Sequence, residues 1–278
     1  MLAVSYFWKR FKRHKPAIVG LIVVFFYIII AVFGPYIAPY DPVTLHIEDR
    51  LQKPSAKYLF GTDAFGRDIL SRVIYGTRIS MTIGILSILM GVVIGGTMGV
   101  IAGYFSYLER IIMFVVDVLL AFPSILLAIG VMTILGPGIY SVIIAVTIRQ
   151  IPSFSRMVRS VVLSVKNYEY IEAARALGSS NARIIFKSIL PNSFAPILVY
   201  STLQIGWNIL LAAILSFLGI GVPPPIPEWG RMVAEGRNFL RQAPHIATFP
   251  GIAIFLLVIS FNMIGDSLRD AIDPKLKI

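Results

Sequence analysis

Long uncharged stretches alternate with short charged blocks along the chain. A membrane-spanning helix needs about 20 mostly apolar residues to cross a hydrocarbon core of about 30 Å. The apolar runs, uncharged except for Asp117, supply six such helices, with the third and fourth in one run divided at the Gly-Pro-Gly of 136–138: 16–40, 79–108, 111–148, 188–227 and 242–265. The pattern predicts an all-α, polytopic membrane protein with six transmembrane helices.

A basic block precedes the first span and contains no acidic residue. Because cytoplasmic flanks are enriched in Lys and Arg, this block predicts a cytoplasmic N-terminus, and an even number of spans then makes both termini cytoplasmic. The block superficially resembles a secretory signal, but the apolar run is too long and has no small-residue cleavage pattern, so we expect a retained helix. The block consists of Lys9, Arg10, Lys12, Arg13 and Lys15.

The expected domain order follows from these spans. Residues 1–15 form a cytoplasmic N-terminus, 16–40 the first transmembrane helix and 41–78 an extracytoplasmic segment. Residues 79–278 form a core of five transmembrane helices, which includes a cytoplasmic segment at 165–191.

Composition supports a lipid environment and excludes several classes of site. The chain is 57% hydrophobic and 14% charged, against about half and a quarter in soluble proteins. Its net charge of +11 would suggest nucleic acid in a soluble protein, but the positive-inside rule explains the basic blocks, and we expect no nucleic-acid partner. The absence of cysteine excludes disulfides and thiolate metal sites, and the three histidines lack ligand spacing, so no metal site is expected.

No stretch of the chain predicts a nucleotide fold. The segment 61–68 has two glycines five apart, but Arg67 and Asp68 replace the Lys and Ser/Thr of a phosphate loop. We therefore expect a non-catalytic chain that binds no cofactor of its own.

The segment between the fourth and fifth spans is too polar to cross a membrane and too regular for a loose loop. Residues 172–177 favour a helix, and Gly178 can adopt the positive φ that ends one. Asn181 is expected to cap a second helix, and Pro191 to end it.

The second helix is expected to be amphipathic. Ala182, Ile185, Phe186 and Ile189 recur at helical spacing, while the basic residues Arg183 and Lys187 face elsewhere. Periodicity alone leaves two interpretations open, a protein-docking helix pair and an interfacial helix lying on lipid headgroups.

The segment also contains Glu172, Ala173 and Ala174, followed by Gly178 and then by Leu190 and Pro191. This pattern resembles the EAA signature of ABC-importer permeases. It departs from that signature at Ser188, where an apolar residue is usual. In that family the signature implies a coupling helix that sits in a cleft of a separate ATPase subunit. Carried onto this chain, the resemblance assigns the ATPase-coupling role to Glu172, Ala173, Ala174, Gly178, Arg183, Phe186, Leu190 and Pro191.

Two further stretches narrow the resemblance. Residues 61–80 and 217–275, the latter containing PEWGRMVAEGR and FPGIAIF, resemble the C-type permeases of dipeptide, oligopeptide and nickel importers. The fold implied is the transmembrane domain of a type I ABC importer in a bacterial or archaeal cytoplasmic membrane. The function implied is import of small peptides, with nickel or another small polar solute as the alternative.

The resemblance also implies the partners. They are a second, related permease that completes a heterodimer, one or two cytoplasmic ATPase subunits that hold ATP and Mg²⁺, and an extracytoplasmic solute-binding protein. An ion-coupled secondary transporter is the rival class, but such a protein has no use for the segment at 172–191.

Two features inside the spans predict helix contacts. Gly91, Gly95, Gly99 and Gly103 lie four apart in the second span and predict close packing within this subunit or, as the alternative, a moving contact along the transport path. Asp117 and Arg149 carry charges that are costly in the bilayer, about 2.5–3.5 kcal/mol each on insertion scales, so we expect them to form an intramembrane ion pair.

Overall fold

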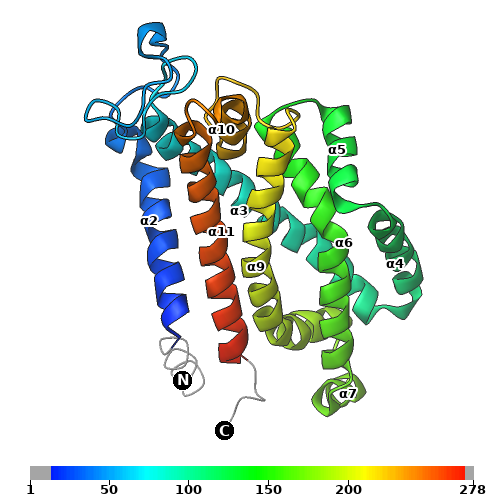
Figure 1. Cartoon of the computed structure of the whole chain (residues 1–278). Helices are drawn as coiled ribbons and strands as arrows, with labels where there is room; N and C mark the ends of the chain where they lie inside the picture. The colour runs from blue at the N-terminus through cyan, green and yellow to red at the C-terminus, as the bar shows by residue number, and fades with distance from the viewer. Residues whose placement is uncertain (1–13, 273–278) are drawn as a thin grey trace.

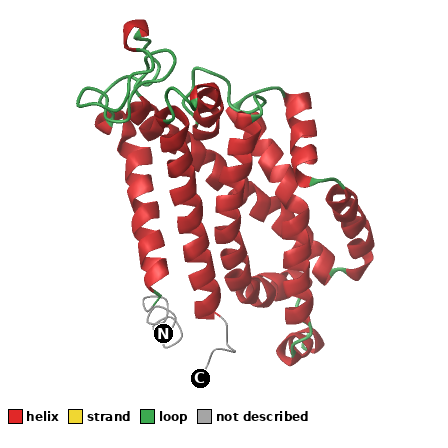
Figure 2. Ribbon diagram, viewed as in Figure 1, coloured by secondary structure: helices red, strands yellow, loops and turns green. Residues whose placement is uncertain are grey.

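The computed structural model describes residues 14–272, and the basic block at 9–13 and the last six residues lie outside them. Within the described range every regular element is a helix (Figure 2). The one β-type contact there is an isolated bridge between Thr62 and Asp68. The long helices are α2 (Lys15–Ile37), α3 (Ile69–Tyr104), α4 (Ser106–Ala121), α5 (Ser124–Leu135), α6 (Ile139–Lys166), α9 (Leu190–Phe217) and α11 (His245–Ile272).

The bundle has two distinct ends (Figure 1). At the α7 end lie the short helix α7 (Glu169–Ala176), the start of α2 and the end of α11. At the α10 end lie helix α10 (Trp229–Gly236) and the first connection, which we define as residues 38–68. Short elements complete the chain: η1 (Ile47–Asp49), α8 (Asn181–Ile184), the π-helical turn η2 (Ile185–Ile189) and η3 (Arg237–Phe239).

The predicted count of six spans is not confirmed. By length and hydropathy the described residues contain four candidate spans, which are α2, α3, α11 and the continuous helix Asn181–Phe217. A fifth is possible if α4 and α5, bent by 94°, count as one broken span. Helix α6 is long enough, but Arg149, Gln150 and Arg156 make it too polar to qualify.

Helix boundaries differ from the predicted spans where polar residues or proline intervene. Helix α3 begins at Ile69, ten residues before the predicted start at Ile79, because Asp68 caps it by accepting a hydrogen bond from the Ser71 amide. The predicted third span breaks at Phe122, which is extended (ψ 136°) because a residue that precedes proline disfavours the α conformation.

The glycines of α3 pack against α6. A Cβ at Gly95 would lie 2.8 Å from the Ile151 carbonyl oxygen, and one at Gly99 would lie 2.6 Å from that of Ser155. The Ser155 hydroxyl donates to the Gly95 carbonyl oxygen at 3.1 Å. The prediction of close packing within this subunit is confirmed, since only glycine allows these backbones to approach so closely.

A buried polar link also joins the central helices. Gln150 of α6 donates to the Ser87 carbonyl of α3, and Asn208 of α9 donates to the Gln150 side-chain oxygen at 2.9 Å. Gln150 and Asn208 are both buried. These bonds fix the mutual register of α3, α6 and α9, because a buried amide left without partners is costly.

Candidate functional site

Helix α7 ends in a hydrogen-bonded turn built around Gly178. The Gly178 amide donates to the Arg175 carbonyl, and the Ser179 amide donates to the Ala174 carbonyl, both at 3.0 Å. Gly178 has φ of +78°, which confirms the predicted conformation, and a Cβ there would meet no atom within 4 Å. The backbone angle, rather than crowding, therefore favours glycine at this position.

The second helix of the segment begins one residue earlier than predicted. Its cap is Ser180, whose hydroxyl oxygen accepts a hydrogen bond from the Arg183 amide at 3.4 Å. Asn181, the predicted cap, instead accepts a hydrogen bond from the Tyr104 hydroxyl at 2.8 Å. That prediction was wrong because two adjacent residues both suit a cap, and the side chain of Asn181 is drawn to the end of α3.

The apolar face of the second helix also differs from the prediction. Ile184 and Ile189 are buried, whereas Ala182 and Phe186 are exposed. The cause is the π-helical turn at 185–189, where bonds run from residue i to i+5 and bring residues five apart to one side. A strictly α-helical period cannot reveal this face.

Pro191 does not end the helix as predicted. It lies directly after the π-helical turn η2, as the second residue of α9, and the helix runs on through it. Residues 181–217 consequently form one continuous helix that joins the segment directly to a span.

The inner side of the segment is anchored to the bundle. Ile171, Ile184 and Ile189 belong to one apolar core with Val162 and Val165 of α6. Outside this core, the Lys166 ammonium donates to the Tyr104 carbonyl at 2.8 Å, and the Asn192 amide donates to the Tyr170 hydroxyl at 3.1 Å. The segment is thus fixed to α3, α6 and α9.

The outer side of the segment forms what we call the α7 surface, consisting of Glu172, Ala173, Leu177, Gly178 and Phe186. All five are exposed, Leu177 to 87% and Phe186 to 69%. The other predicted site residues lie around it: Arg183 is exposed, Ala174 and Leu190 are half-buried, and Pro191 is exposed on α9. Large apolar side chains beside a carboxylate on a rigid protrusion suit contact with another protein.

The predicted pair of Asp117 and Arg149 is wrong. Asp117 of α4 pairs with Arg156 of α6 at 2.6 Å, and a second pair joins Glu109 to Arg159. Arg149 makes no ion pair within the described residues. It lies seven residues before Arg156, about 10 Å along α6, and the bend at Phe122 keeps α4 beside the later part of that helix.

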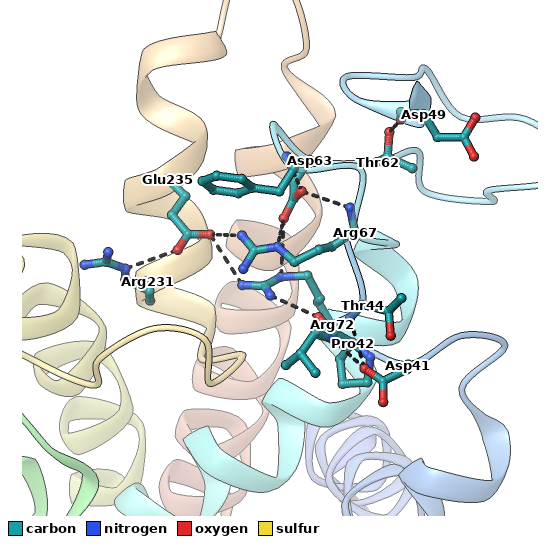
Figure 3. Close-up of polar contacts among 12 residues, drawn as sticks. Asp41, Pro42, Thr44, Asp49, Thr62, Asp63, Arg67, Arg72, Arg231 and Glu235 are labelled. Atoms are coloured by element: carbon teal, nitrogen blue, oxygen red, sulfur yellow. Dashed lines mark hydrogen bonds and ion pairs between the residues drawn. The ribbon is translucent and has the colours of Figure 1, made fainter. Parts of the chain in front are cut away.

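The α10 end holds a charge cluster that the sequence analysis missed (Figure 3). We define the α10-end cluster as Asp63, Arg67, Arg72 and Glu235. Arg67 lies 2.6 Å from Asp63 and 2.9 Å from Glu235, and Arg72 lies 3.7 Å and 3.4 Å from the same carboxylates. The Arg72 side chain is only 1% exposed. These pairs connect the first connection and α3 to α10.

Two other carboxylates order this end. Glu228 caps α10 by accepting hydrogen bonds from the Gly230 and Arg231 amides, at 2.9 and 2.8 Å. Burial raises the pKa of Glu228, although these amide bonds act in the opposite direction. In the first connection, the hydrogen bond from the Lys57 ammonium at 2.7 Å lowers the pKa of Asp49. Helix α10 begins at Trp229, directly after the capping carboxylate of Glu228.

Comparison with known families and proteins gives a consistent match. The family described as "Binding-protein-dependent transport system inner membrane component" matches residues 91–278, and "N-terminal TM domain of oligopeptide transport permease C" matches residues 4–54. The dipeptide transport system permease protein DppC of Alkalihalophilus pseudofirmus is 48% identical over 97% of this chain and 89% of its own length. The glutathione transport system permease protein GsiD of Pectobacterium atrosepticum is 49% identical over 98% and 91%.

Solved structures show the same fold at lower identity. A chain of the inward-facing MetNI methionine ABC transporter has a TM-score of 0.63 and 20% identity, covering 74% of this chain and 98% of its own length. A chain of an amino acid ABC transporter determined with histidines has a TM-score of 0.53 and 16% identity, covering 71% and 92%. The predicted all-α permease fold and the predicted resemblance are both confirmed. The chain belongs to the family of binding-protein-dependent transport system inner membrane components.

Proposed function

We propose that the chain is the transmembrane permease subunit of an ABC importer that carries small peptides across the cytoplasmic membrane. The support is the near-full-length identity of 47–49% to dipeptide and glutathione permeases, since glutathione is itself a small peptide. Nickel or another small polar solute is the alternative cargo.

The single structural observation that carries the mechanism is the form of the segment at 169–191. It is fixed to the bundle by a buried apolar core and continues without a break into α9, while the α7 surface is exposed. A rigid element of this kind can pass a displacement at its outer side directly to α6 and α9. We assign the α7 surface as the docking site of a partner ATPase subunit, with Glu172 and Leu177 at its centre.

The orientation of the bundle follows from charge. The basic block before α2 favours a cytoplasmic N-terminus, and the start of α2 lies at the same end as α7 (Figure 1). The α7 surface then faces the cytoplasm, where ATPases reside, and the α10 end faces outward, where a solute-binding protein delivers cargo.

The other subunits of the proposed transporter are separate chains. The proposed assembly pairs this chain with a second, related permease, adds one or two ATPase subunits and assigns ATP and Mg²⁺ to them. The chain itself is non-catalytic in this proposal: it provides half of the path, and its partners hydrolyse the ATP.

Uptake into proteoliposomes tests the proposal. The full assembly, with partner permease, ATPases and binding protein, is reconstituted and supplied with radiolabelled dialanine, glutathione or Ni²⁺. The expected result is peptide uptake that requires ATP and stops with a non-hydrolysable analogue. Uptake driven by an ion gradient without ATP would contradict the proposal, and ATP-dependent uptake of Ni²⁺ alone would establish the alternative cargo.

A further inference from the structure

A charged groove lies between α4 and α6, apart from the α7 surface. Its volume is about 640 Å³, within the range of about 300–1,000 Å³ that is usual for small-molecule sites. Both ion pairs between these helices, Asp117 with Arg156 and Glu109 with Arg159, line it, together with Arg110.

The charges in this groove are exposed rather than buried between the helices. The side chains of Asp117 and Arg156 are 61% and 57% exposed, and those of Glu109 and Arg159 about half as much. Ion pairs so exposed on membrane helices are costly against lipid tails, so this side of the bundle must face water or protein. By contrast, α4 exposes Ile111 and Val115 elsewhere on its surface, as a lipid or a neighbouring helix would require.

The paired groups retain unused bonding capacity. Asp117 accepts from Arg156 through Oδ1, and Glu109 accepts both Arg159 bonds through Oε1, so the second oxygen of each carboxylate forms no hydrogen bond within the described residues. A carboxylate can accept at both oxygens, and a guanidinium has five donors. The three arginines and two carboxylates together leave one excess positive charge.

Both signs of charge occur at a spacing that a short peptide can bridge. Glu109 and Asp117 lie eight residues apart, about 12 Å along α4. An extended chain covers at most about 3.5 Å per residue, so two or three residues reach most of the way from one ion pair to the other. A phospholipid headgroup fits less well, because two carboxylates would repel its phosphate.

We propose that this groove binds the charged ends of a peptide in transit. Arg156 and its neighbouring arginines take the terminal carboxylate, and Asp117 or Glu109 takes the terminal ammonium. When the groove is empty the same groups pair with each other, which avoids isolated charges in the membrane. The assignment rests on the proposed peptide-import function and names the site on this chain that the peptide contacts.

Cysteine protection tests occupancy directly, because the chain has no native cysteine. Met113→Cys introduces a thiol at a half-buried position that lines the groove. The reconstituted assembly is treated with a small hydrophilic thiol reagent, and the rate of labelling is measured by mass spectrometry of this chain. The expected result is labelling that dialanine slows. Leu45→Cys, exposed in the first connection, should label without protection. A groove filled by the partner permease would leave Met113→Cys unlabelled and would overturn the proposal.

Transport kinetics test the roles of the charges. Arg156→Gln should raise the KM for dialanine uptake about tenfold, the loss of one charge-assisted hydrogen bond, but not the KM for dialanine amide, which lacks the carboxylate. Arg156→Lys, which keeps the positive charge, should leave the KM for dialanine near the wild-type value. Arg269→Gln removes an exposed cation at the end of α11, away from the groove. It should leave the KM values for dialanine and for dialanine amide unchanged.

A charge swap separates binding from packing. In Asp117→Arg/Arg156→Asp the pair is restored with reversed signs, so assembly and thermal stability should recover while the KM for dialanine stays raised. Full recovery of KM by the swap, or an unchanged KM in Arg156→Gln, would overturn the site while leaving the proposed function intact. Absence of ATP-dependent uptake of any peptide by the wild-type assembly would overturn both.

Discussion

The two ends of the bundle hold their connecting segments in opposite ways. At the α10 end, four charged side chains pair with one another across as many as 168 residues of sequence, and Arg67 and Arg72 are almost completely buried. At the α7 end, an apolar core holds the inner side of the segment and leaves Leu177 and Phe186 exposed. The charges of the α10-end cluster are paired within this chain, whereas the α7 surface leaves Leu177 and Phe186 exposed, and another protein can cover them.

The largest effect on stability is expected from breaking the α10-end cluster. Arg72→Leu leaves the Asp63 and Glu235 carboxylates without one of their cations, and loss of one partner of a buried pair costs about 3–5 kcal/mol. Arg241→Leu, at an exposed position just beyond η3, serves as the control and should change the free energy of unfolding by less than about 0.5 kcal/mol. Denaturant unfolding in detergent measures both. Equal effects would show that the cluster adds nothing beyond surface charge.

The next largest effect is expected at the turn after α7. Gly178→Pro demands φ near −65° where the chain has +78°, and it removes the amide that donates to Arg175, at a cost of about 3 kcal/mol within the segment. Because the bundle core is untouched, the chain should still insert and assemble while transport-linked ATP hydrolysis falls more than tenfold. Glu172→Lys should uncouple the ATPase in the same way without changing stability. Transport-linked hydrolysis that survived both changes would contradict the docking assignment.

The seam between α3 and α6 offers a matched pair three residues apart. Gly99→Ala places a Cβ 2.6 Å from the Ser155 carbonyl and should destabilise the bundle by about 1–3 kcal/mol, because the two backbones must separate. Gly96→Ala meets no atom within 4 Å and should stabilise the helix by up to about 1 kcal/mol. Opposite shifts in thermal midpoint are the expected outcome, and shifts of the same sign would show that the helices yield freely.

The smallest effect concerns the cap of the second helix. Ser180→Ala removes the hydroxyl that accepts from the Arg183 amide and should cost about 1 kcal/mol, measured as faster amide hydrogen exchange confined to residues 180–184. Asn181→Ala should instead release the Tyr104 hydroxyl and increase exchange at the end of α3. If both changes affected the same amides, the separate roles of the two side chains would be wrong.

The helical fold and the turn within the segment after α6 could be predicted from sequence because they depend on local patterns. Uncharged runs indicated a bundle of long apolar helices, although not their number. The spacing of Gly95 and Gly99 indicated close packing of two helices, and Gly178 indicated the turn after α7. The face of the second helix could not be predicted, because a π-helical turn breaks the α-helical period and places Ile184 and Ile189 on the buried side.

The ion pairs were harder still to predict. The arginine that pairs with Asp117 is decided by the position of the break after α4 and by the axial position of α4 relative to α6. The spacing of charges along the sequence determines neither. The α10-end cluster joins Asp63 to Glu235, and no sequence period connects residues so far apart. The stripe formed by Arg156 and Arg159 on α6 was the one signal that could have identified the groove.

The central claim, that an ATPase subunit docks on the α7 surface, is tested most directly by site-specific cross-linking in the assembled transporter. Since the chain has no cysteine, Leu177→Cys can carry a single short thiol-reactive cross-linker, with the buried Ile189→Cys as its matched control on the inner side. The account predicts a covalent product with the ATPase subunit from Leu177→Cys and none from Ile189→Cys. A product with lipid or with the solute-binding protein, and none with the ATPase, would contradict it.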